Sequence, residues 1–293
     1  MLETRSDKWL TGVIAVLLAF VSLLVLYPLV YVFSASLSNP AAVFQGQMWL
    51  WPVDLTLTGY KRLFQNSEIL IGYRNTLLYT VAGTAINLVM TIAAAYPLSR
   101  RDFYGRNFFT MMIVFTMFFS GGMIPTYLLV KNLGLLNTFW AMVLPSALSV
   151  WNILIMRTFF QNSIPHEIEE AASMDGSSNL QTLWRIVLPL SVPILAVMVL
   201  FYSVGHWNSY FSALVYLSDR DKYPLQLILR EILLQGEMQE MVDVREGTLS
   251  NSLLDAEAIK YASVIVANLP MLILYPFLQK YFVKGVMIGA IKG

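Results

Sequence analysis

The sequence contains no cysteine, only two histidines and few charged residues. The lack of cysteine excludes disulfide bonds and thiol chemistry within this chain, and the apolar runs hold no clustered carboxylates. We therefore expect no metal site and no nucleophilic catalytic centre. Charged residues make up 13% of the chain, whereas about 25% is usual in soluble proteins. This shortage favours a membrane protein, and the net charge of +1 gives no reason to expect nucleic-acid binding.

Six apolar runs are each long enough to cross a bilayer. A hydrocarbon core about 30 Å thick needs roughly 20 apolar residues in a helix, and helices are required because backbone groups facing lipid must bond to one another. We predict an all-α polytopic protein with one membrane domain over residues 1–293. Its six transmembrane helices are expected at residues 9–33, 75–98, 108–130, 139–156, 190–217 and 261–279.

The first run could also be a cleaved signal peptide, but about 25 apolar residues are too many for a signal core. We therefore keep it as a span.

Lysine and arginine are denser in the connections on the N-terminal side, which favours a cytoplasmic N-terminus. Six spans then return the C-terminus to the cytoplasm. In this topology residues 157–188 form a cytoplasmic loop and residues 218–257 an outer loop.

The sequence contains neither a nucleotide-binding motif nor the charged membrane residues typical of ion-coupled transport. No Gly-Lys pair occurs, so the phosphate-binding loop of nucleotide-binding proteins is absent. Within the predicted spans there is no Asp, Glu, Lys or Arg, and His206 is the one readily titratable group. Proton-coupled and ion-coupled carriers usually need such groups near the midplane. We therefore expect the energy to come from a partner.

The stretch EEAASMDGSSNLQTLWRIVLP, residues 169–189, is a dense polar segment between two apolar runs. Ser163 and Pro165 suit the start of a helix, and Asp175-Gly176 suits its end because Gly accepts a left-handed conformation. Asn179 then suits the cap of a second short helix that stops before Pro189. The segment is predicted to form two short helices joined by a sharp turn.

Two uses of this loop are open from the residues alone. Ala171, Ala172 and Gly176 allow close approach of a partner, and Glu170 can make charge-assisted hydrogen bonds of about 1.5–3 kcal/mol. The alternative is an interfacial helix that lies on the membrane.

A longer pattern around this segment carries a resemblance. Residues 164–193, IPHEIEEAASMDGSSNLQTLWRIVLPLSVP, closely resemble the cytoplasmic EAA loop of permease subunits in binding-protein-dependent ABC importers, in the maltose-importer-like sugar branch. The C-terminal stretch YFVKGVMIGAIKG is also similar to the family's ending. Residues that match the family's ATPase-coupling pattern are Glu170, Ala171, Ala172, Asp175, Gly176, Leu188 and Pro189.

The resemblance implies a type I ABC importer permease fold with cytoplasmic coupling helices, embedded in the lipid of the inner membrane. It implies that the chain itself is not an enzyme and binds no cofactor, with ATP and Mg bound by two partner ATPase subunits. The further partners implied are a second related permease, an extracytoplasmic solute-binding protein and a saccharide.

The segment HWNSYF in the fifth run is similar to a Trp-Asn-x-aromatic segment of the family. Aromatic faces suit the C–H surfaces of a sugar, and an amide suits its hydroxyls. The candidates for the substrate path are His206, Trp207, Asn208, Tyr210 and Phe211. The alternative is that these residues pack helices together, line the membrane interface or, for His206, bond to a neighbour.

The outer stretch YPLQLILREILLQ, residues 223–235, has apolar residues at helical spacing. It resembles the branch of sugar permeases that handles oligosaccharides and polysaccharides, including the alginate importer. The resemblance places this loop against the binding protein, with Tyr223, Pro224, Leu225, Gln226 and Arg230 as candidate contacts. The alternative is a helix that folds onto its own spans.

The family resemblance leads to the hypothesis of an ATP-driven importer permease for an oligosaccharide or polysaccharide. Two other functions remain as alternatives. One is a stand-alone secondary carrier, and the other is a membrane scaffold protein that uses the loop only to dock a partner.

Overall fold

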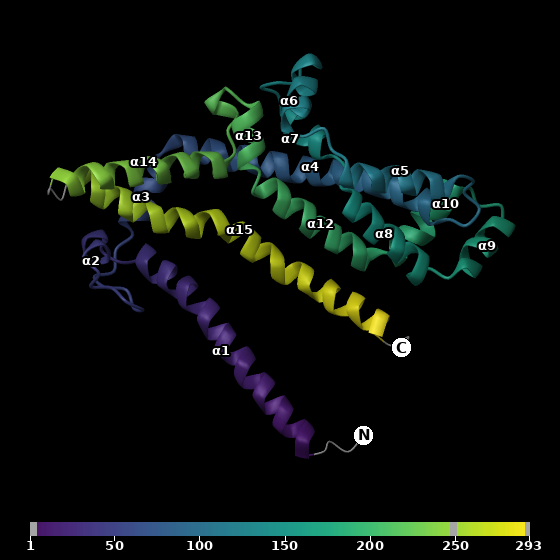
Figure 1. The fold of residues 1–293 in the computed structure, drawn as a ribbon, viewed down its shortest axis with the longest axis horizontal. Helices are drawn as coiled ribbons and strands as arrows, with labels where there is room; N and C mark the ends of the chain where they lie inside the picture. Colours follow the sequence, from purple (N-terminus) through teal and green to yellow (C-terminus); the bar gives the residue numbers. More distant parts are fainter. Residues whose placement is uncertain (1–4, 247–250, 291–293) are drawn as a thin grey trace. The chain divides into compact units, whose positions relative to one another are not determined.

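The computed structural model describes residues 5–246 and 251–290. These residues form helices and connecting turns, without a strand (Figure 1). The prediction of an all-helical protein is therefore confirmed. Two compact units are formed, one from the described residues of Met1–Ile69 and Leu229–Leu269, the other from those of Leu70–Ile228 and Pro270–Gly293.

Three single helices within the described residues are long and apolar enough to cross a membrane. They lie at Lys8–Ser36 within α1 (Arg5–Ser36), along α4 (Ser67–Ser99), and at Ala256–Pro276 within α15 (Asn251–Ala290). Three bent pairs of helices raise the number of spans to as many as six if each pair is one span.

Two of the bends fall inside predicted spans, residues 108–130 and 139–156, and the third falls at the start of the span predicted at 190–217. The first joins α5 (Arg106–Phe118) to α6 (Met123–Asn132) at 110°, and the second joins Phe139–Ser146, which contains α7 (Phe139–Val143), to α8 (Val150–Ser163) at 53°. The third joins Asn179–Leu190 to α12 (Val192–Trp207) at 83°. Residues 108–130 are thus not one straight helix, because Gly122 adopts a left-handed φ of +84° between α5 and α6.

The predicted fifth span, residues 190–217, is also divided. Helix α12 ends at Trp207, and α13 (Tyr210–Tyr216) follows as a separate short helix. Two side chains donate hydrogen bonds to backbone carbonyls in the last turn of α12. Asn208 Nδ2 donates to the Val204 oxygen at 2.9 Å, and Ser209 Oγ donates to the His206 oxygen at 2.6 Å. Such side-chain bonds compete with the helical ladder, so the helix stops there.

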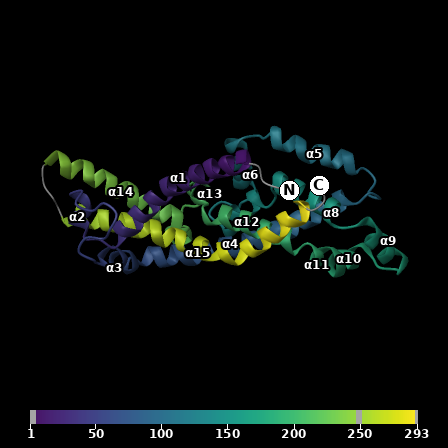
Figure 2. The ribbon, with the colours of Figure 1, turned by 90° about the horizontal axis from the view of Figure 1, so that it is seen from below.

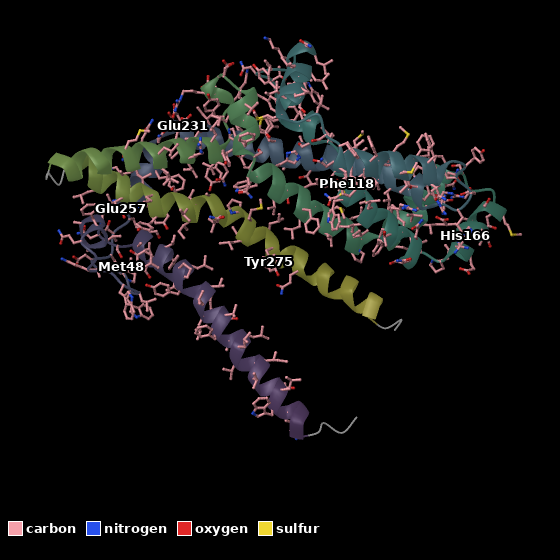
Figure 3. The ribbon with its side chains drawn as sticks, viewed as in Figure 1. Met48, Phe118, His166, Glu231, Glu257 and Tyr275 are labelled. Atoms are coloured by element: carbon pink, nitrogen blue, oxygen red, sulfur yellow. The ribbon has the colours of Figure 1, made fainter. Side chains whose placement is uncertain are left out.

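The first unit contains α1, α2 (Pro40–Phe44), α3 (Thr58–Gln65) and parts of α14 (Leu225–Glu246) and α15. Its small core is formed by Ala35, Val43 and Met48. Tyr31 and Tyr261 pack against this core, edge to face with their ring centres 6.1 Å apart. Most of α1 is outside the core, and its apolar side chains project on all sides (Figure 3). A helix that is apolar all round is typical of a membrane span.

In the second unit α4, α8 and α12 lie alongside one another (Figures 1 and 2). Their shared core includes Ala95, Met156 and Met198, none of which is exposed to solvent. A hydrogen bond of 2.6 Å between Thr91 Oγ1 and Tyr202 Oη adds a polar link between α4 and α12. Helix α9 (His166–Met174) lies at one end of this unit in both views.

We expect Gly59→Ala to destabilise the first unit. A Cβ atom at Gly59 would clash with the backbone oxygen of Ala258, and such overpacking typically costs about 1–3 kcal/mol. Thermal unfolding of the purified protein should show a Tm several degrees lower. Gly12→Ala is the control, because nothing lies within 4 Å of that position. Equal Tm values for the two variants would contradict the close contact of α3 with α15.

Candidate functional site

Helix α9 carries the charged part of the loop between α8 and α12. Ser163 is the last residue of α8 rather than the cap of α9, and Pro165 is in the N-cap position without a side-chain hydrogen bond. Ser163 was therefore wrong as the cap, whereas the helix does begin directly after Pro165, whose backbone is extended at that point. The helix ends at Met174, and Gly176 turns the chain with a φ of +77°, as expected.

The second short helix, α10 (Asn179–Thr182), is capped by Ser178 and not by Asn179. Ser178 Oγ accepts a hydrogen bond from the Gln181 backbone at 3.3 Å. Contrary to expectation, the helical run continues past Pro189 through a π turn at Leu183–Val187 and α11 (Leu188–Leu190). Pro189, which has no N–H, stands just after this π turn, where the usual i→i−4 hydrogen-bond ladder is already interrupted.

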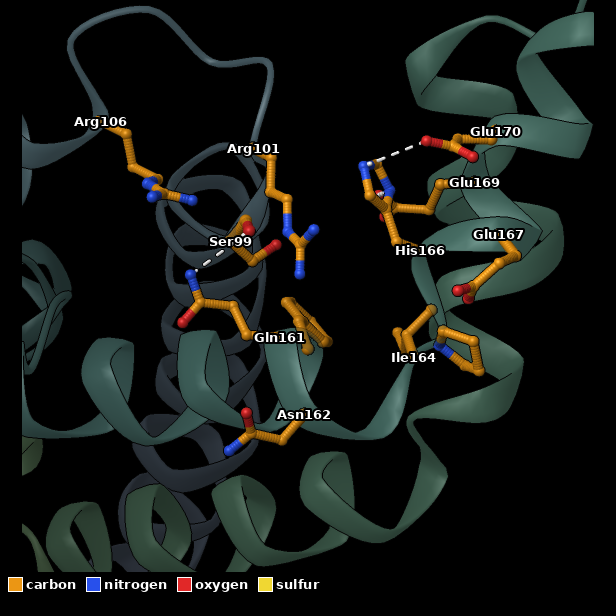
Figure 4. A pocket seen from close by; sticks show the side chains of 12 residues that line it. Ser99, Arg101, Arg106, Gln161, Asn162, Ile164, His166, Glu167, Glu169 and Glu170 are labelled. Carbon is orange, nitrogen blue, oxygen red and sulfur yellow. Dashed lines mark hydrogen bonds and ion pairs between the residues drawn. The ribbon is translucent and has the colours of Figure 1, made fainter.

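A groove of about 680 Å³ separates α9 from the ends of α4 and α8 (Figure 4). Arg101 and Arg106 lie on one wall and α9 forms the other. On α9, His166 Nε2 lies 3.5 Å from Glu170 Oε1, and His166 Nδ1 lies 3.9 Å from Glu169 Oε2. The groove is lined by Ser99, Arg101, Arg106, Phe160, Gln161, Asn162, Ile164, Pro165, His166, Glu167, Glu169 and Glu170.

An ion pair shapes the turn that presents the two arginines. Arg100 Nε donates to Asp102 Oδ1 and Arg100 Nη2 to Asp102 Oδ2, both at 2.8 Å. The hydrogen bond with Arg100 holds the pKa of Asp102 below its usual value, although burial opposes the shift, so the aspartate stays charged. Arg100 Nη1 also donates to Tyr96 Oη at 3.1 Å. These bonds fix the start of the turn after α4, next to Arg101. Arg106 Nη1 donates to the Arg100 oxygen at 3.4 Å, which holds the second arginine at the same turn.

The residues predicted to couple to an ATPase are divided between the surface and the interior. Glu170, Ala171, Asp175, Gly176 and Pro189 are exposed, Leu188 is half-buried, and Ala172 is buried. Ala172 thus packs inward instead of offering close approach to a partner. The most exposed large apolar side chains of the loop are Met174 at 89%, and Leu180 and Trp184 at 70% each. Exposed apolar side chains at such a site favour docking of a partner.

A smaller cavity of about 330 Å³ lies at the break between α12 and α13. It contains three of the predicted substrate-path residues, His206, Asn208 and Phe211. Trp207 does not line it, because its side chain is 1% exposed and packs edge to face against Tyr73 at 6.1 Å. Tyr210 also lies outside the wall. The lining residues are Met142, Ser146, Phe201, Tyr202, Gly205, His206, Asn208, Ser209, Phe211 and Ser212.

The predicted contacts for a binding protein are likewise only partly at the surface. Leu225 is fully buried, and its backbone N–H donates to Thr76 Oγ1 at 2.8 Å, while Pro224 is buried as well. These two candidates were wrong as surface contacts, because the apolar repeat from residue 223 turns inward. Tyr223 and Gln226 are half-buried and Arg230 is exposed. Residues 247–250 of the predicted outer loop and 291–293 of the C-terminal motif lie outside the described residues.

Comparisons with known proteins agree with the pattern of the loop. The family model described as binding-protein-dependent transport system inner membrane component matches residues 69–288. Protein LplC of Bacillus subtilis is 42% identical over 93% of this chain and 91% of its own length. The polygalacturonan/rhamnogalacturonan transport system permease protein YtcP of the same organism is 41% identical over 93% and 94%.

A comparison with solved structures also finds a chain of an ABC transporter. A crystal structure of a bacterial ABC transporter involved in the import of the acidic polysaccharide alginate contains a chain 38% identical to this one, with a TM-score of 0.85. The match covers 96% of this chain and 99% of that chain. At this similarity the fold of the two chains is the same over nearly their whole length.

The turn after α9 offers a test of the loop geometry. Gly176→Val should loosen α9, since a branched residue at φ +77° costs about 1–2 kcal/mol. Gly176→Asn should be nearly neutral, because asparagine tolerates the left-handed region and nothing lies within 4 Å of the Cβ position. Hydrogen exchange of the α9 amides should therefore rise in the valine variant only. Equal exchange in the two variants would mean that the turn does not constrain α9.

Proposed function

The chain belongs to the family of binding-protein-dependent transport system inner membrane components, and we propose that it is the permease subunit through which an ABC importer takes up an acidic oligosaccharide or polysaccharide. In this proposal the chain performs no chemistry. It forms half of an alternating-access path and passes the motion of ATPase subunits to that path.

The observation that carries the proposal is the arrangement around α9. The helix stands apart from α4 and α8 across a charged groove, with Glu170 and Ala171 exposed on its surface. Charged and apolar side chains displayed together on a short exposed helix suit the docking of a soluble protein. The sequence has no phosphate-binding loop of its own, so ATP and Mg are assigned to the docked ATPases.

The proposed assembly contains this chain, a second related permease, two ATPases and an extracytoplasmic binding protein. With α9 on the ATPase side, the loop from α8 to α12 and both termini are cytoplasmic. The break between α12 and α13 and the connection through Tyr223 and Gln226 then face the outside, where a binding protein delivers its cargo.

The cargo class follows from the relatives. One relative is named for polygalacturonan and rhamnogalacturonan transport, and one solved neighbour for alginate import. Polygalacturonan and alginate are both polymers of sugar acids. Other relatives named for sugar uptake, such as the arabinooligosaccharide permease AraQ of Halalkalibacterium halodurans at 25% identity, are less similar. We therefore assign uronate oligosaccharides as the cargo to test first.

Uptake should require ATP on the α9 side of the membrane and a loaded binding protein on the other. The test is reconstitution of the assembly in vesicles with oligogalacturonates and alginate oligosaccharides as probes. Vesicles containing ATP should accumulate at least one of them, and vesicles containing a non-hydrolysable analogue should not. Uptake by this chain alone, driven by a proton gradient, would instead support a secondary carrier.

The charge of Glu170 should be needed for coupling. Glu170→Gln removes a group able to make charge-assisted hydrogen bonds of about 1.5–3 kcal/mol, so the ATPases should bind about 10- to 100-fold more weakly. Glu170→Lys should abolish both ATPase binding and uptake, with the chain still folded in the membrane.

Gln181→Lys provides the matched control for Glu170→Gln, because it raises the net charge by the same one unit at an exposed position of the same loop. It should leave ATPase binding within about twofold, as is usual for surface changes. Wild-type binding in Glu170→Lys would place the ATPase interface elsewhere.

A further inference from the structure

We infer that the cavity at the break between α12 and α13 is a saccharide subsite of this subunit, in which His206 accepts a hydroxyl hydrogen through Nδ1. The inference rests on the proposed function and adds to it a place and a chemistry of recognition. It assigns to this site the uncharged, hydroxyl-bearing part of the cargo.

The wall of the cavity carries no ionised side chain: among its lining residues there is no Asp, Glu, Lys or Arg. Phe201 and Phe211 supply aromatic faces, and Ser212 and Asn208 supply polar groups. Sugar rings offer C–H faces and hydroxyls that match such a wall. A carboxylate would enter without a cation to pair with it, which is costly in an apolar surrounding. The site therefore suits a hydroxyl-bearing ring face, and the acid groups of the cargo have to be neutralised elsewhere.

The hydrogen bonds behind the wall determine the tautomer of His206. Asn87 Nδ2 donates to the Ser146 carbonyl oxygen, which can only accept. The other amide atom, Asn87 Oδ1, therefore faces His206 Nε2 at 2.6 Å, and it too can only accept. Nε2 must then carry the hydrogen, and in the neutral ring Nδ1 holds a lone pair. His206 is 5% exposed, and Nδ1 has no hydrogen-bond partner among the described residues.

Gly83 lets the ring reach this position. A Cβ atom at Gly83 would lie 2.5 Å from His206 Nε2 and 2.6 Å from Cε1. Only a residue without a side chain allows the imidazole to come so close to α4 and bond with Asn87 one helical turn further on. Asn87 and Gly83 are thus positioning residues, and His206 is the residue that touches the cargo.

His206→Gln separates the two roles of the histidine. Its amide nitrogen can still donate to Asn87 and keep α12 against α4. Glutamine has carbon at the δ position and its acceptor oxygen at the ε position, so the acceptor at the place of Nδ1 is lost. The test uses the complete importer in vesicles, with whichever of the two uronate oligosaccharides the wild type takes up. We expect initial uptake to fall about three- to tenfold, the loss of one neutral hydrogen bond. ATP hydrolysis stimulated by the loaded binding protein should stay within about twofold, because a binding defect leaves the coupling loop intact.

The second part of the experiment compares two variants of aromatic residues in the same uptake assay. Phe211→Leu changes the cavity wall, whereas Tyr216→Leu changes an aromatic residue of the same helix that lies outside the wall and stacks on Tyr127. Uptake should fall in the first variant and stay at the wild-type rate in the second. Wild-type uptake in both His206→Gln and Phe211→Leu would overturn the subsite and leave the proposed function standing. A parallel loss of uptake and ATP hydrolysis in His206→Gln would also overturn it, since it would mean a structural defect. A wild type that imports neither oligosaccharide would overturn the proposed cargo itself.

Discussion

The second unit depends on how α4 buries its polar side chains inside an apolar helix bundle. Along one side of this helix Thr76, Thr80, Thr84, Asn87 and Thr91 are all buried. Polar groups in such a place are costly unless they are hydrogen-bonded, so the partners of Thr76, Asn87 and Thr91 determine which segments can lie against α4. The hydroxyls of Thr80 and Thr84 have no hydrogen-bond partner among the described residues. Thr76 holds the start of α14, Asn87 holds His206 and the Ser146 carbonyl, and Thr91 holds Tyr202. The row thus fixes the position and rotation of α12 next to α4.

The same principle explains where the helices break. Asn208 and Ser209 bond to carbonyls of α12 with their own side chains, and the helix ends at that point. On the outer connection Asn75 Nδ2 donates to the carbonyls of Asp221 and Tyr223 at 2.7 and 3.1 Å. Hydrogen bonding with Lys222 and Asn137 lowers the pKa of Asp219, which keeps a negative charge in this connection. Irregular backbone is therefore present where neighbouring side chains satisfy it, as an apolar medium requires.

The sequence predicts the helical class and the charged loop well because both depend on composition. A bilayer needs long apolar helices, and a segment such as residues 169–189 stands out against them. Helix bends are harder to predict, since a few bonds around Gly122 or Asn208 decide them. The cap at Ser178 was missed by one residue because serine and asparagine are both good caps.

Burial was the other quantity that the sequence could not provide. In a membrane protein an apolar residue can face lipid, a partner or the core, so the pattern alone does not place Trp207 or Leu225 inside. The groove was missed because its arginines, Arg101 and Arg106, are some sixty residues away in sequence from α9. The cavity wall likewise combines residues of α7 and α12 that only the tertiary fold brings together. A polar residue in an apolar run, such as Asn87 in the second span, was the available signal.

In the proposed function, the groove beside α9 and the cavity at the break between α12 and α13 have different roles, and they differ in charge. The groove beside α9 is lined by ionised groups, which suits a reversible contact with a soluble protein, whereas the cavity wall is uncharged. Helix α12 begins directly after the loop and ends at the cavity. At 1.5 Å per residue its length is about 24 Å. It meets the segment Asn179–Leu190 at 83°, with Ser191 fully buried at the corner. In the proposed importer a displacement of the loop at this corner would move α12 against α4, because a helix is stiff along its axis. The hydrogen bonds of Thr91 and Asn87 are the contacts that such a movement would have to exchange.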